Sequence, residues 1–425
     1  MGKTLHRSWW ILVIATLNLL ACLGFGRFSF GAIMPFMKEG LTLNYSQTGL
    51  IASSVFLGYL LSATTVGYAV MRFTAKKVII VSLFITVLGM IGSGLSYNFW
   101  TAYLSCLIIG IGAGAGNVTN LGLVGKWFVS RYRGMALGVV NAGSGIGMVL
   151  SGIFVPYMMV SYADDGWRFS WYILAAAILL FILLNLLFMK NDPSEVGMNP
   201  YGDSERKEDK KTAKQVHRED EHKSQTVYRN KLLWMIGFVY LTWGFSYLIF
   251  STFFMDYLIQ DVRLGEKAAG QLFAVAGFAS ILSGYIWGSV SDRIGRMPSL
   301  FLVYISQAVL LLAFSMTDHY VLLLVETVLY AVTLWGVPTV MVAAVGDFVH
   351  PLKTPVAIGF ITLFFGVGQF ISPVITGTLV DLSGSYLTAF FLSSFVCFLG
   401  SVGCIVLHLK RKKELSVVQD NRITI

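Results

Sequence analysis

Two ionisable side chains stand inside long apolar stretches of the sequence, where a charge is costly. Arg27 lies in the stretch 9–37 and Glu326 in the stretch 319–345. A charged side chain at the centre of a bilayer costs at least about 2.5 to 3.5 kcal/mol, so each group should have a partner or a task. The rise of a helix places both roughly 12 to 15 Å from the same end of their helices, so we expect them to share one cavity.

The chemistry available to these two groups is the binding of an anion and the exchange of a proton. A guanidinium grips a carboxylate through two parallel hydrogen bonds, so Arg27 is predicted to bind an anionic group of a solute. Glu326 is predicted to be the proton-coupling group, because a carboxyl can change its protonation as a cavity alternates between two sides. In the alternative interpretation, the two groups pair with each other or with backbone carbonyls and only brace the helices.

The composition shows that water is not the main solvent of this chain. Of 425 residues, 56% are hydrophobic and only 12% are charged, and the mean hydropathy is +0.71. In lipid every backbone polar group must be satisfied internally, which leaves helices or a closed barrel. Continuous apolar runs such as 78–95 and 173–189 lack the alternating polarity of barrel strands and predict transmembrane helices.

Charges and turn residues divide the chain into two sets of six apolar segments. The segments are 9–37, 45–71, 77–97, 100–124, 134–161, 168–189, 232–256, 268–290, 298–316, 319–345, 355–380 and 386–409. Between the sets, residues 190–231 carry both signs of charge and little apolar surface, which predicts a solvated linker. We therefore expect an all-α membrane protein with a six-helix bundle over 1–189, a charged cytoplasmic linker over 190–231, and a second six-helix bundle with a basic cytoplasmic tail over 232–425.

The distribution of Lys and Arg predicts the orientation in the membrane. If both termini are cytoplasmic, only Lys38, Arg168, Arg263 and Lys267 of the 31 Lys and Arg fall on the outer side, and Arg27 lies within the first helix. This asymmetry satisfies the positive-inside rule and predicts a multi-pass protein of the cell membrane with both ends inside. It also accounts for the net charge of +9 without a nucleic-acid partner.

The sequence contains no residue pattern that would indicate metal, cofactor or enzymatic chemistry. The four Cys and six His have no ligand or disulfide spacing, so we expect neither metal nor cofactor. No nucleotide loop and no Gly-x-Ser-x-Gly elbow occurs, which argues against ATP-driven transport and against an enzyme. The glycine series of residues 110–116, like Gly143, Gly145 and Gly147, predicts close helix packing.

The two sets of segments are related by an internal repeat. Gly67 and Arg72 follow the second segment, and Gly288 and Arg293 follow the eighth at the same separation. In the first and seventh segments, Gly24-Phe-Gly-Arg27-Phe-Ser-Phe30 aligns with Gly244-Phe-Ser-Tyr247-Leu-Ile-Phe250. Paired helical halves are typical of secondary transporters, which bind substrate between the halves near the middle of the bilayer.

With the loop Gly-x-x-x-Asp-Arg-x-Gly-Arg at residues 288–296, the chain resembles the major facilitator superfamily over its whole length. The resemblance implies two pseudo-symmetric six-helix bundles, alternating access, a monomeric protein, and a cytoplasmic charge latch in this loop. The residues implied for that gating motif are Gly67, Arg72, Gly288, Asp292, Arg293, Gly295 and Arg296. The first copy departs from the pattern, with Met71 in place of the acid, so the second copy is expected to be the stronger latch.

The resemblance also implies which side chains line the central cavity. Besides Arg27, the predicted substrate-binding residues are Tyr247, Asn117, Asn120, Asn141, Trp335 and Gln369, with Asn18, Tyr59 and Trp243 as further polar or aromatic neighbours. Tyr247 is the strongest of these candidates, because the repeat sets it opposite Arg27. Each of these residues alone is better explained by a structural role, such as a helix-to-helix hydrogen bond, than by ligand binding.

Other motifs narrow the resemblance and leave the function open between several classes. Gly166-Trp167-Arg168 and Asp192-Pro-Ser-Glu-Val-Gly197 are similar to the monocarboxylate and oxalate/formate-exchanger group, and Gly24-Phe-Gly26-Arg27-Phe with Pro35 resembles its YbfB/YjiJ-type branch. The first expectation is symport or antiport of a small anionic organic solute, coupled to protons. The alternatives are a multidrug or metabolite efflux antiporter, which the 14% aromatic content favours, and a non-transporting membrane sensor.

Overall fold

The regular structure of the protein is helical throughout the part that its computed structural model describes, residues 6–202, 228–349 and 353–423. The first half contains α1 (Arg7–Leu19), the π-helix η1 (Leu20–Phe28), α2 (Ser29–Gly40), α3 (Tyr45–Arg72), α4 (Ala75–Gly94), α5 (Phe99–Trp127), α6 (Ser130–Tyr162) and α7 (Gly166–Phe188). The second half contains α9 (Lys231–Leu248), the π-helix η4 (Ile249–Phe253), α10 (Phe254–Gln260), α11 (Glu266–Ile294), α12 (Arg296–Phe314), α13 (Tyr320–Leu334), α14 (Gly336–Phe348), α15 (Thr354–Ser383) and α16 (Leu387–Ile423).

The predicted number of membrane spans is confirmed. Among the described residues, 11 helical stretches are long and apolar enough to cross a bilayer, and the longest, Arg131–Phe188, contains both α6 and α7. Counting these two helices separately gives the twelve expected spans, each within a few residues of its predicted bounds. Of the predicted linker, residues 203–227 lie outside the described residues.

Three spans of the first half, α3, α4 and α5, begin at a capping side chain. The Asn44 side chain accepts a hydrogen bond from the backbone of Gln47 and starts α3 with a capping box. Asn98 does the same for α5 with Thr101, and Thr74 caps α4. Such caps satisfy backbone N–H groups that have no partner within the helix, which defines the start of each span.

The first span of each half contains a π-helical stretch. The continuous helix Arg7–Gly40 includes η1, and the continuous helix Lys231–Gln260 includes η4. π-helical turns are rare and occur frequently at functional sites. The shared interruption agrees with the internal repeat, and η1 contains Arg27.

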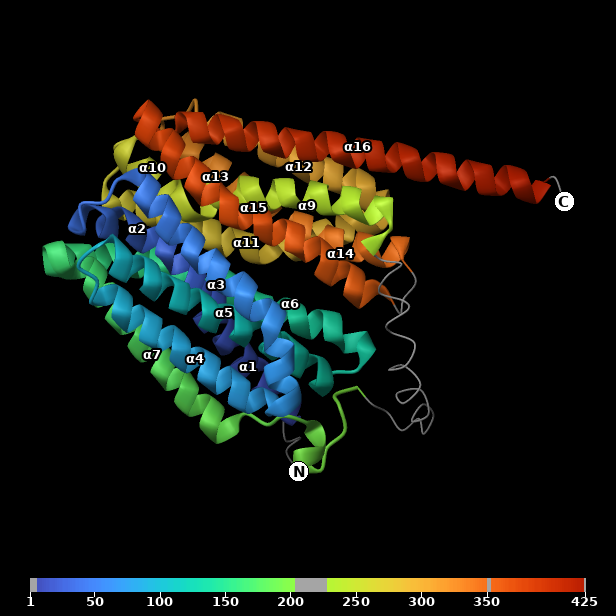
Figure 1. The fold of residues 1–425 in the computed structure, drawn as a ribbon, viewed down its shortest axis with the longest axis horizontal. Helices are drawn as coiled ribbons and strands as arrows, with labels where there is room; N and C mark the ends of the chain where they lie inside the picture. Colours follow the sequence, from blue (N-terminus) through green and yellow to red (C-terminus); the bar gives the residue numbers. More distant parts are fainter. Residues whose placement is uncertain (1–5, 203–227, 350–352, 424–425) are drawn as a thin grey trace. The chain divides into compact units, whose positions relative to one another are not determined.

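The chain forms two compact units. The first contains Met1–Arg206, Ile249–Ile281 and Pro373–Tyr386. Within it α5 packs between α3 and α4, α7 lies on the other side of α4, and α6 packs against α1 and η1 (Figure 1).

The second compact unit contains Lys207–Leu248, Leu282–Ser372 and Leu387–Ile425. In this unit α12 lies along α16 and also contacts α13 and α14, and α9 packs against α16 and α14. The predicted division into bundles over 1–189 and 232–425 stays a prediction, because the helices of residues 249–281 and 373–386 are grouped with the first unit.

One face of α7 shows why a bilayer is needed around the first unit. Leu179, Leu183, Leu186 and Leu187 recur at helical spacing and are each about half exposed. On α4, Val81, Phe84 and Leu88 form a similar exposed stripe. Continuous apolar faces of this length have no favourable contact with water, and lipid is the solvent that fits them.

The predicted role of the glycines of α5 and α6 in close helix packing is confirmed. An added Cβ at Gly110 would collide with the backbone of Val55, and one at Gly114 with the backbone of Tyr59. At Gly147 the added atom would meet the backbone of Gly24, within η1. Small residues therefore let α3 approach α5, and α6 approach η1, backbone to backbone.

Candidate functional site

Arg27 lies in the π-helical turn η1 and is surrounded by aromatic rings. Its guanidinium carbon is 4.6 Å from the ring centre of Phe56 and 5.5 Å from those of Phe28 and Tyr59. Phe56 and Tyr59 come from α3, so two spans of the first unit form this environment. Aromatic faces attract a cation electrostatically, so these rings stabilise the charge of Arg27 in an apolar environment.

Asn117 on α5 extends this aromatic environment with an amide. Its Nδ2 donates to the hydroxyl of Tyr59 at 2.6 Å. Its Oδ1 is buried and has no hydrogen-bond partner among the described residues. If the amide is turned over, Nδ2 becomes the open atom, so in either orientation Asn117 offers one polar atom to a ligand. Arg27, Tyr59 and Asn117 are therefore brought together, and we name them the Arg27 site.

Asn120 belongs to a different network, although it is only one helical turn from Asn117. Asn18 donates from Nδ2 to Asn120 at 3.2 Å and to Asn185 at 3.0 Å, and Asn185 donates back to Asn18 at 2.6 Å. Asn120 itself donates to the carbonyl of Ala15 at 2.8 Å. These buried amides join α1, α5 and α7, so Asn120 is not part of the Arg27 site. Its predicted contact with substrate stays a prediction.

Asn141 occupies a more open position on α6. It is exposed, and its backbone carbonyl accepts a hydrogen bond from Ser144 Oγ at 2.7 Å. The structure does not place Asn141 in the Arg27 site. Its predicted contact with substrate stays a prediction.

Three of the predicted binding residues meet in the second compact unit. Tyr247 stacks on Trp243 with ring centres 4.5 Å apart, and Trp335 lies 6.4 Å from Tyr247. Gln369 donates from Nε2 to the Tyr247 hydroxyl. Phe365 extends the stack at 5.1 Å from Trp243. We name these five residues the aromatic stack.

The aromatic stack is positioned by a break between two helices. Trp335 separates α13 from α14, and its backbone N–H donates to Ser283 Oγ at 2.9 Å. Pro338 lies in the first turn of α14, where its missing N–H is tolerated. The helix is thus interrupted close to Pro338. Trp243 Nε1 is buried without a hydrogen-bond partner among the described residues.

Glu326 sits on α13 and is held by a neighbouring loop. Thr317 Oγ1 donates to Glu326 Oε1 at 2.8 Å, while Oε2 is buried without a partner among the described residues. Glu326 belongs to the second unit and Arg27 to the first. The prediction that they share one cavity therefore stays a prediction.

The two copies of the gating motif differ in their contacts. In the second copy Arg296 Nη1 is 2.6 Å from Asp292 Oδ1, and its Nε is 3.5 Å from Asp347 Oδ2 near the end of α14. Gly295 separates α11 from α12 with φ +95°, a conformation that side chains rarely adopt. Arg293 is exposed, and Gly288 lies on the last turns of α11.

In the first copy, the described residues show no comparable arrangement. Arg72 is exposed and its guanidinium lies 5.9 Å from the ring centre of its neighbour Phe73. Gly67 is also exposed and faces open space. These contacts favour the expectation that the second copy provides the stronger latch.

The motif Asp192–Gly197 also has a structural account. Asp192 starts a 3-10 turn over Pro193–Val196, and Gly197 ends it with φ +66°. The hydroxyl and the backbone N–H of Ser194 both donate to Asp192 and hold the pKa of that carboxyl below its ordinary value. The motif thus shapes the chain directly after α7.

Comparison with known proteins settles the family. The model of the Major Facilitator Superfamily matches residues 16–341. The chain belongs to the Major Facilitator Superfamily. It is accordingly a multi-pass membrane transporter of small solutes and not an enzyme; members of this superfamily are typically monomeric.

Curated members of the superfamily resemble the chain over most of its length. The hexuronate transporter of Bacillus subtilis (strain 168) is 25% identical, over 87% of this chain and 88% of its own. The phosphoglycerate transporter protein of Salmonella typhimurium is 23% identical, over 90% of this chain and 84% of its own. A probable sulfoacetate transporter of Cupriavidus necator is 24% identical, over 90% of each chain.

Solved superfamily structures share the fold. A D-xylose–proton symporter aligns with a TM-score of 0.76 at 14% identity, covering 93% of this chain and 97% of its own. A bacterial homologue of the lysosomal transporter Spinster aligns with a TM-score of 0.69 at 15% identity, covering 95% and 96%. At these identities the likeness concerns the fold alone, and it confirms the predicted all-α architecture.

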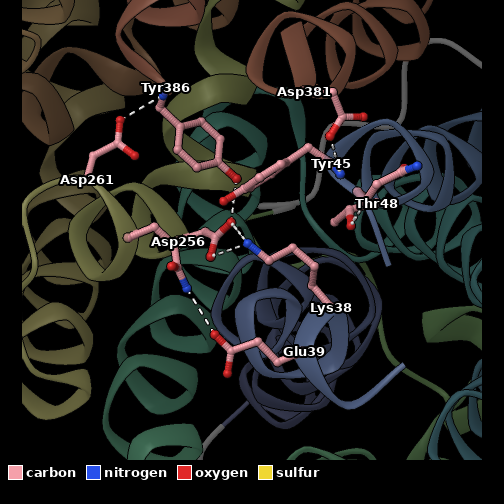
Figure 2. Close-up of polar contacts among 10 residues, drawn as sticks. Lys38, Glu39, Tyr45, Thr48, Asp256, Asp261, Asp381 and Tyr386 are labelled. Carbon is pink, nitrogen blue, oxygen red and sulfur yellow. Dashed lines mark hydrogen bonds and ion pairs between the residues drawn. The ribbon is translucent and has the colours of Figure 1, made fainter. Parts of the chain in front are cut away.

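Sequence reasoning missed one polar cluster of this superfamily member. Lys38 Nζ lies 2.9 Å from Asp256 Oδ2 and 3.3 Å from Oδ1, and both side chains are buried (Figure 2). The sequence alone predicts an outer-loop position for Lys38, because Lys38 follows the first apolar segment. The internal repeat could have indicated this pair. Lys38 and Asp256 lie near the ends of the first spans of the two halves, and their separation in sequence is close to that of the repeat.

Proposed function

We propose that the protein carries a small organic anion across the cell membrane by alternating access, with proton coupling, and that Arg27 binds the anionic group. The proposal retains both termini in the cytoplasm, as the distribution of Lys and Arg predicts. It also retains the resemblance to the YbfB/YjiJ-type branch as a prediction.

The observation that carries the proposal is the setting of Arg27. Three aromatic rings lie within 5.5 Å of its guanidinium carbon, in a π-helical turn of the first span. Rings hold the charge in an apolar environment, and a guanidinium presents two parallel N–H groups to a carboxylate.

Asn117 narrows the solute to an anion that also carries a hydroxyl. Its open amide atom is buried, and an unpaired buried polar atom is costly unless a ligand satisfies it. Because Asn117 is bonded to Tyr59, whose ring faces Arg27, one solute can reach both groups. The names of two relatives, a hexuronate transporter and a phosphoglycerate transporter, describe solutes of this hydroxylated anionic kind.

Glu326 is proposed as the proton-coupling group. Its carboxyl is partly buried within a span, and only one of its oxygens is engaged, by Thr317. A carboxyl in such a setting can take up a proton without losing a charged partner. If Glu326→Gln still accumulates solute against a gradient in response to pH, this role is wrong.

Uptake into proteoliposomes with an imposed pH gradient tests the proposal. The panel should contain sugar acids, simple monocarboxylates and neutral sugars. We expect accumulation of hydroxylated anions when the outer side is acidic, and no accumulation of neutral sugars. The control variant is Val160→Ala, because Val160 is 80% exposed on α6 and touches none of the sites described.

The aromatic stack favours a second candidate, efflux of flat amphipathic compounds by antiport. Trp243, Tyr247 and Phe365 present nearly parallel rings, and Trp243 Nε1 has an unused donor among the described residues. Such surfaces bind planar apolar solutes through stacking. Transport of aromatic cations that is lost in Trp243→Ala, but kept in Arg27→Gln, would favour this candidate over the first.

A further inference from the structure

Lys38 and Asp256 form an ion pair that is almost completely removed from water. Asp256 is 0% exposed and Lys38 is 7% exposed. Lys38 ends the first span on α2, and Asp256 lies on α10 at the end of the seventh (Figure 2). The pair therefore joins the ends of two spans that are equivalent in the internal repeat, within the first compact unit.

Two tyrosines complete the surroundings of the pair. The Tyr386 hydroxyl donates to Asp256, and the Lys38 ammonium lies 3.9 Å from the ring centre of Tyr45. The two tyrosine rings contact each other edge to face at 5.6 Å. Burial holds the pKa of Tyr386 well above its ordinary value, so this hydroxyl stays protonated and remains a donor. We name Lys38, Asp256, Tyr45 and Tyr386 the Lys38–Asp256 cluster.

Two further carboxylates, Asp381 and Asp261, accept hydrogen bonds from the backbone around the cluster. Asp381, on α15, accepts hydrogen bonds from the backbone N–H groups of Tyr45 at 2.9 Å and Ser46 at 2.7 Å, at the start of α3. Asp261 accepts from the backbone N–H of Tyr386 at 2.7 Å. Both carboxylates come from the second half of the chain, and Asp381 binds the N-terminus of α3 in the first half, where negative charge is favourable.

The same helices touch backbone to backbone at their glycines. An added Cβ at Gly31 on α2 would meet the carbonyl of Ser251, and one at Gly377 on α15 would meet the carbonyl of Tyr45. On α6, an added Cβ at Gly152 would meet Gly270 of α11. At this end of the unit, spans of the first half are thus packed against spans of the second half without room for a side chain.

We propose that the Lys38–Asp256 cluster is a lock that holds this end of the transporter closed, and that solute can enter from this side only after Lys38 and Asp256 separate. The inference rests on the proposed transport by alternating access, and in the orientation proposed above this is the outer end. Separation of the pair exposes both charges to water, which offsets much of their lost attraction. The lock therefore opens only when the pair can be hydrated.

Thiol labelling from outside the cell tests the lock directly. Thr48 on α3 lies beside the cluster and is 2% exposed, so Thr48→Cys should react slowly with a membrane-impermeant maleimide (Figure 2). The four native Cys are buried, which keeps the background low. We expect Lys38→Met or Asp256→Asn to raise the labelling rate about tenfold or more, because each removes one member of the pair.

Matched variants separate the lock from general loosening. Glu39→Gln keeps its exposed contact with Gln260, on the same two helices, and should label at the parent rate. Lys38→Arg keeps the charge and should do the same, and the exchanged pair Lys38→Asp with Asp256→Lys should return labelling toward the parent. Folding of every variant is checked by its monodispersity in detergent.

Two results would overturn the inference. One is parent-rate labelling in folded Lys38→Met and Asp256→Asn. The other is faster labelling only in inverted vesicles, which would place this end inside the cell. Failure of the proposed solute function is recognised separately, because the labelling reaction is measured without substrate.

Discussion

The first span carries two cations that the protein stabilises in opposite ways. Arg27 lies over the rings of Phe28, Phe56 and Tyr59, in a π-helical turn. Lys38, further along the same helix, is paired with the buried carboxylate of Asp256. Both satisfy the requirement that a charge in an apolar environment needs compensation.

The difference shows how a transporter can hold a cation either for a ligand or for itself. A ring compensates a cation through its face and brings no opposite charge, so an anion can still be attracted. A carboxylate neutralises the cation and leaves little attraction for another anion. The Arg27 site therefore suits a solute, and the Lys38–Asp256 cluster suits a contact within the protein.

The largest expected difference between the two cations concerns stability. Lys38→Met leaves Asp256 buried without its counter-charge and should destabilise the closed state by about 3–5 kcal/mol. Arg27→Gln keeps a polar side chain beside the rings of Phe28, Phe56 and Tyr59 and should change stability far less. Thermal unfolding in detergent measures both, and a restored melting temperature in Lys38→Met with Asp256→Leu is the control. Equal losses in the two single variants would break the comparison.

Substrate uptake should reverse this order, because it should depend more on Arg27 than on Lys38. Arg27→Gln removes the charged hydrogen bonds to the solute and should lower uptake efficiency about 100-fold, equivalent to about 2.7 kcal/mol. Arg27→Lys keeps the charge but loses the two parallel N–H donors of the guanidinium. Its uptake efficiency should lie between that of Arg27→Gln and that of the parent. Initial uptake rates in proteoliposomes check this, and parent-like transport by Arg27→Gln would refute the anion site.

Substitution of Asn117 should affect the uptake of hydroxylated anions more than that of other anions. Asn117→Ala removes the open polar atom and should weaken the uptake of hydroxylated anions about tenfold, while anions without a hydroxyl change little. Competition assays with a hydroxylated acid and its deoxy analogue measure the ratio. The control is again Val160→Ala, since Val160 is exposed on α6 and touches none of the sites described. An equal loss for both solutes would assign Asn117 to structure.

The smallest effect is expected from the hydroxyl of Tyr59. Tyr59→Phe keeps the ring beside Arg27 and loses only the bond to Asn117. The loss should be about 0.5–1.5 kcal/mol, seen as a few-fold higher KM with little change in maximal rate. Tyr59→Ala, which also removes the ring, should be clearly worse; if the two variants are equal, the ring contributes nothing to the site.

The spans and the membrane-embedded charge were predictable because both depend on local sequence. Apolar length alone located Arg7–Gly40 and the other spans, and the same run made Arg27 conspicuous. The glycine pattern predicted close packing for the same reason, since only small residues allow helices to touch. These features need no knowledge of which helices are neighbours.

What the sequence did not provide was the pairing of side chains across helices. Asn117 and Asn120 are one turn apart and chemically identical, yet one joins Tyr59 and the other joins Asn18. Lys38 had the appearance of a loop residue, since its partner Asp256 is 218 residues away in the chain. Only the packing of α2 against α10 decides that this ammonium is buried.

The π-helical turn around Arg27 has a mechanical consequence. Such a turn accommodates one surplus residue, and that surplus can migrate along a helix while the flanking segments α1 and α2 keep their places. Migration past Arg27 would swing its guanidinium by about 100° around the helix axis, the angle that one residue subtends. The span can thus redirect its charge by an internal shift of register, with no hinge in the span.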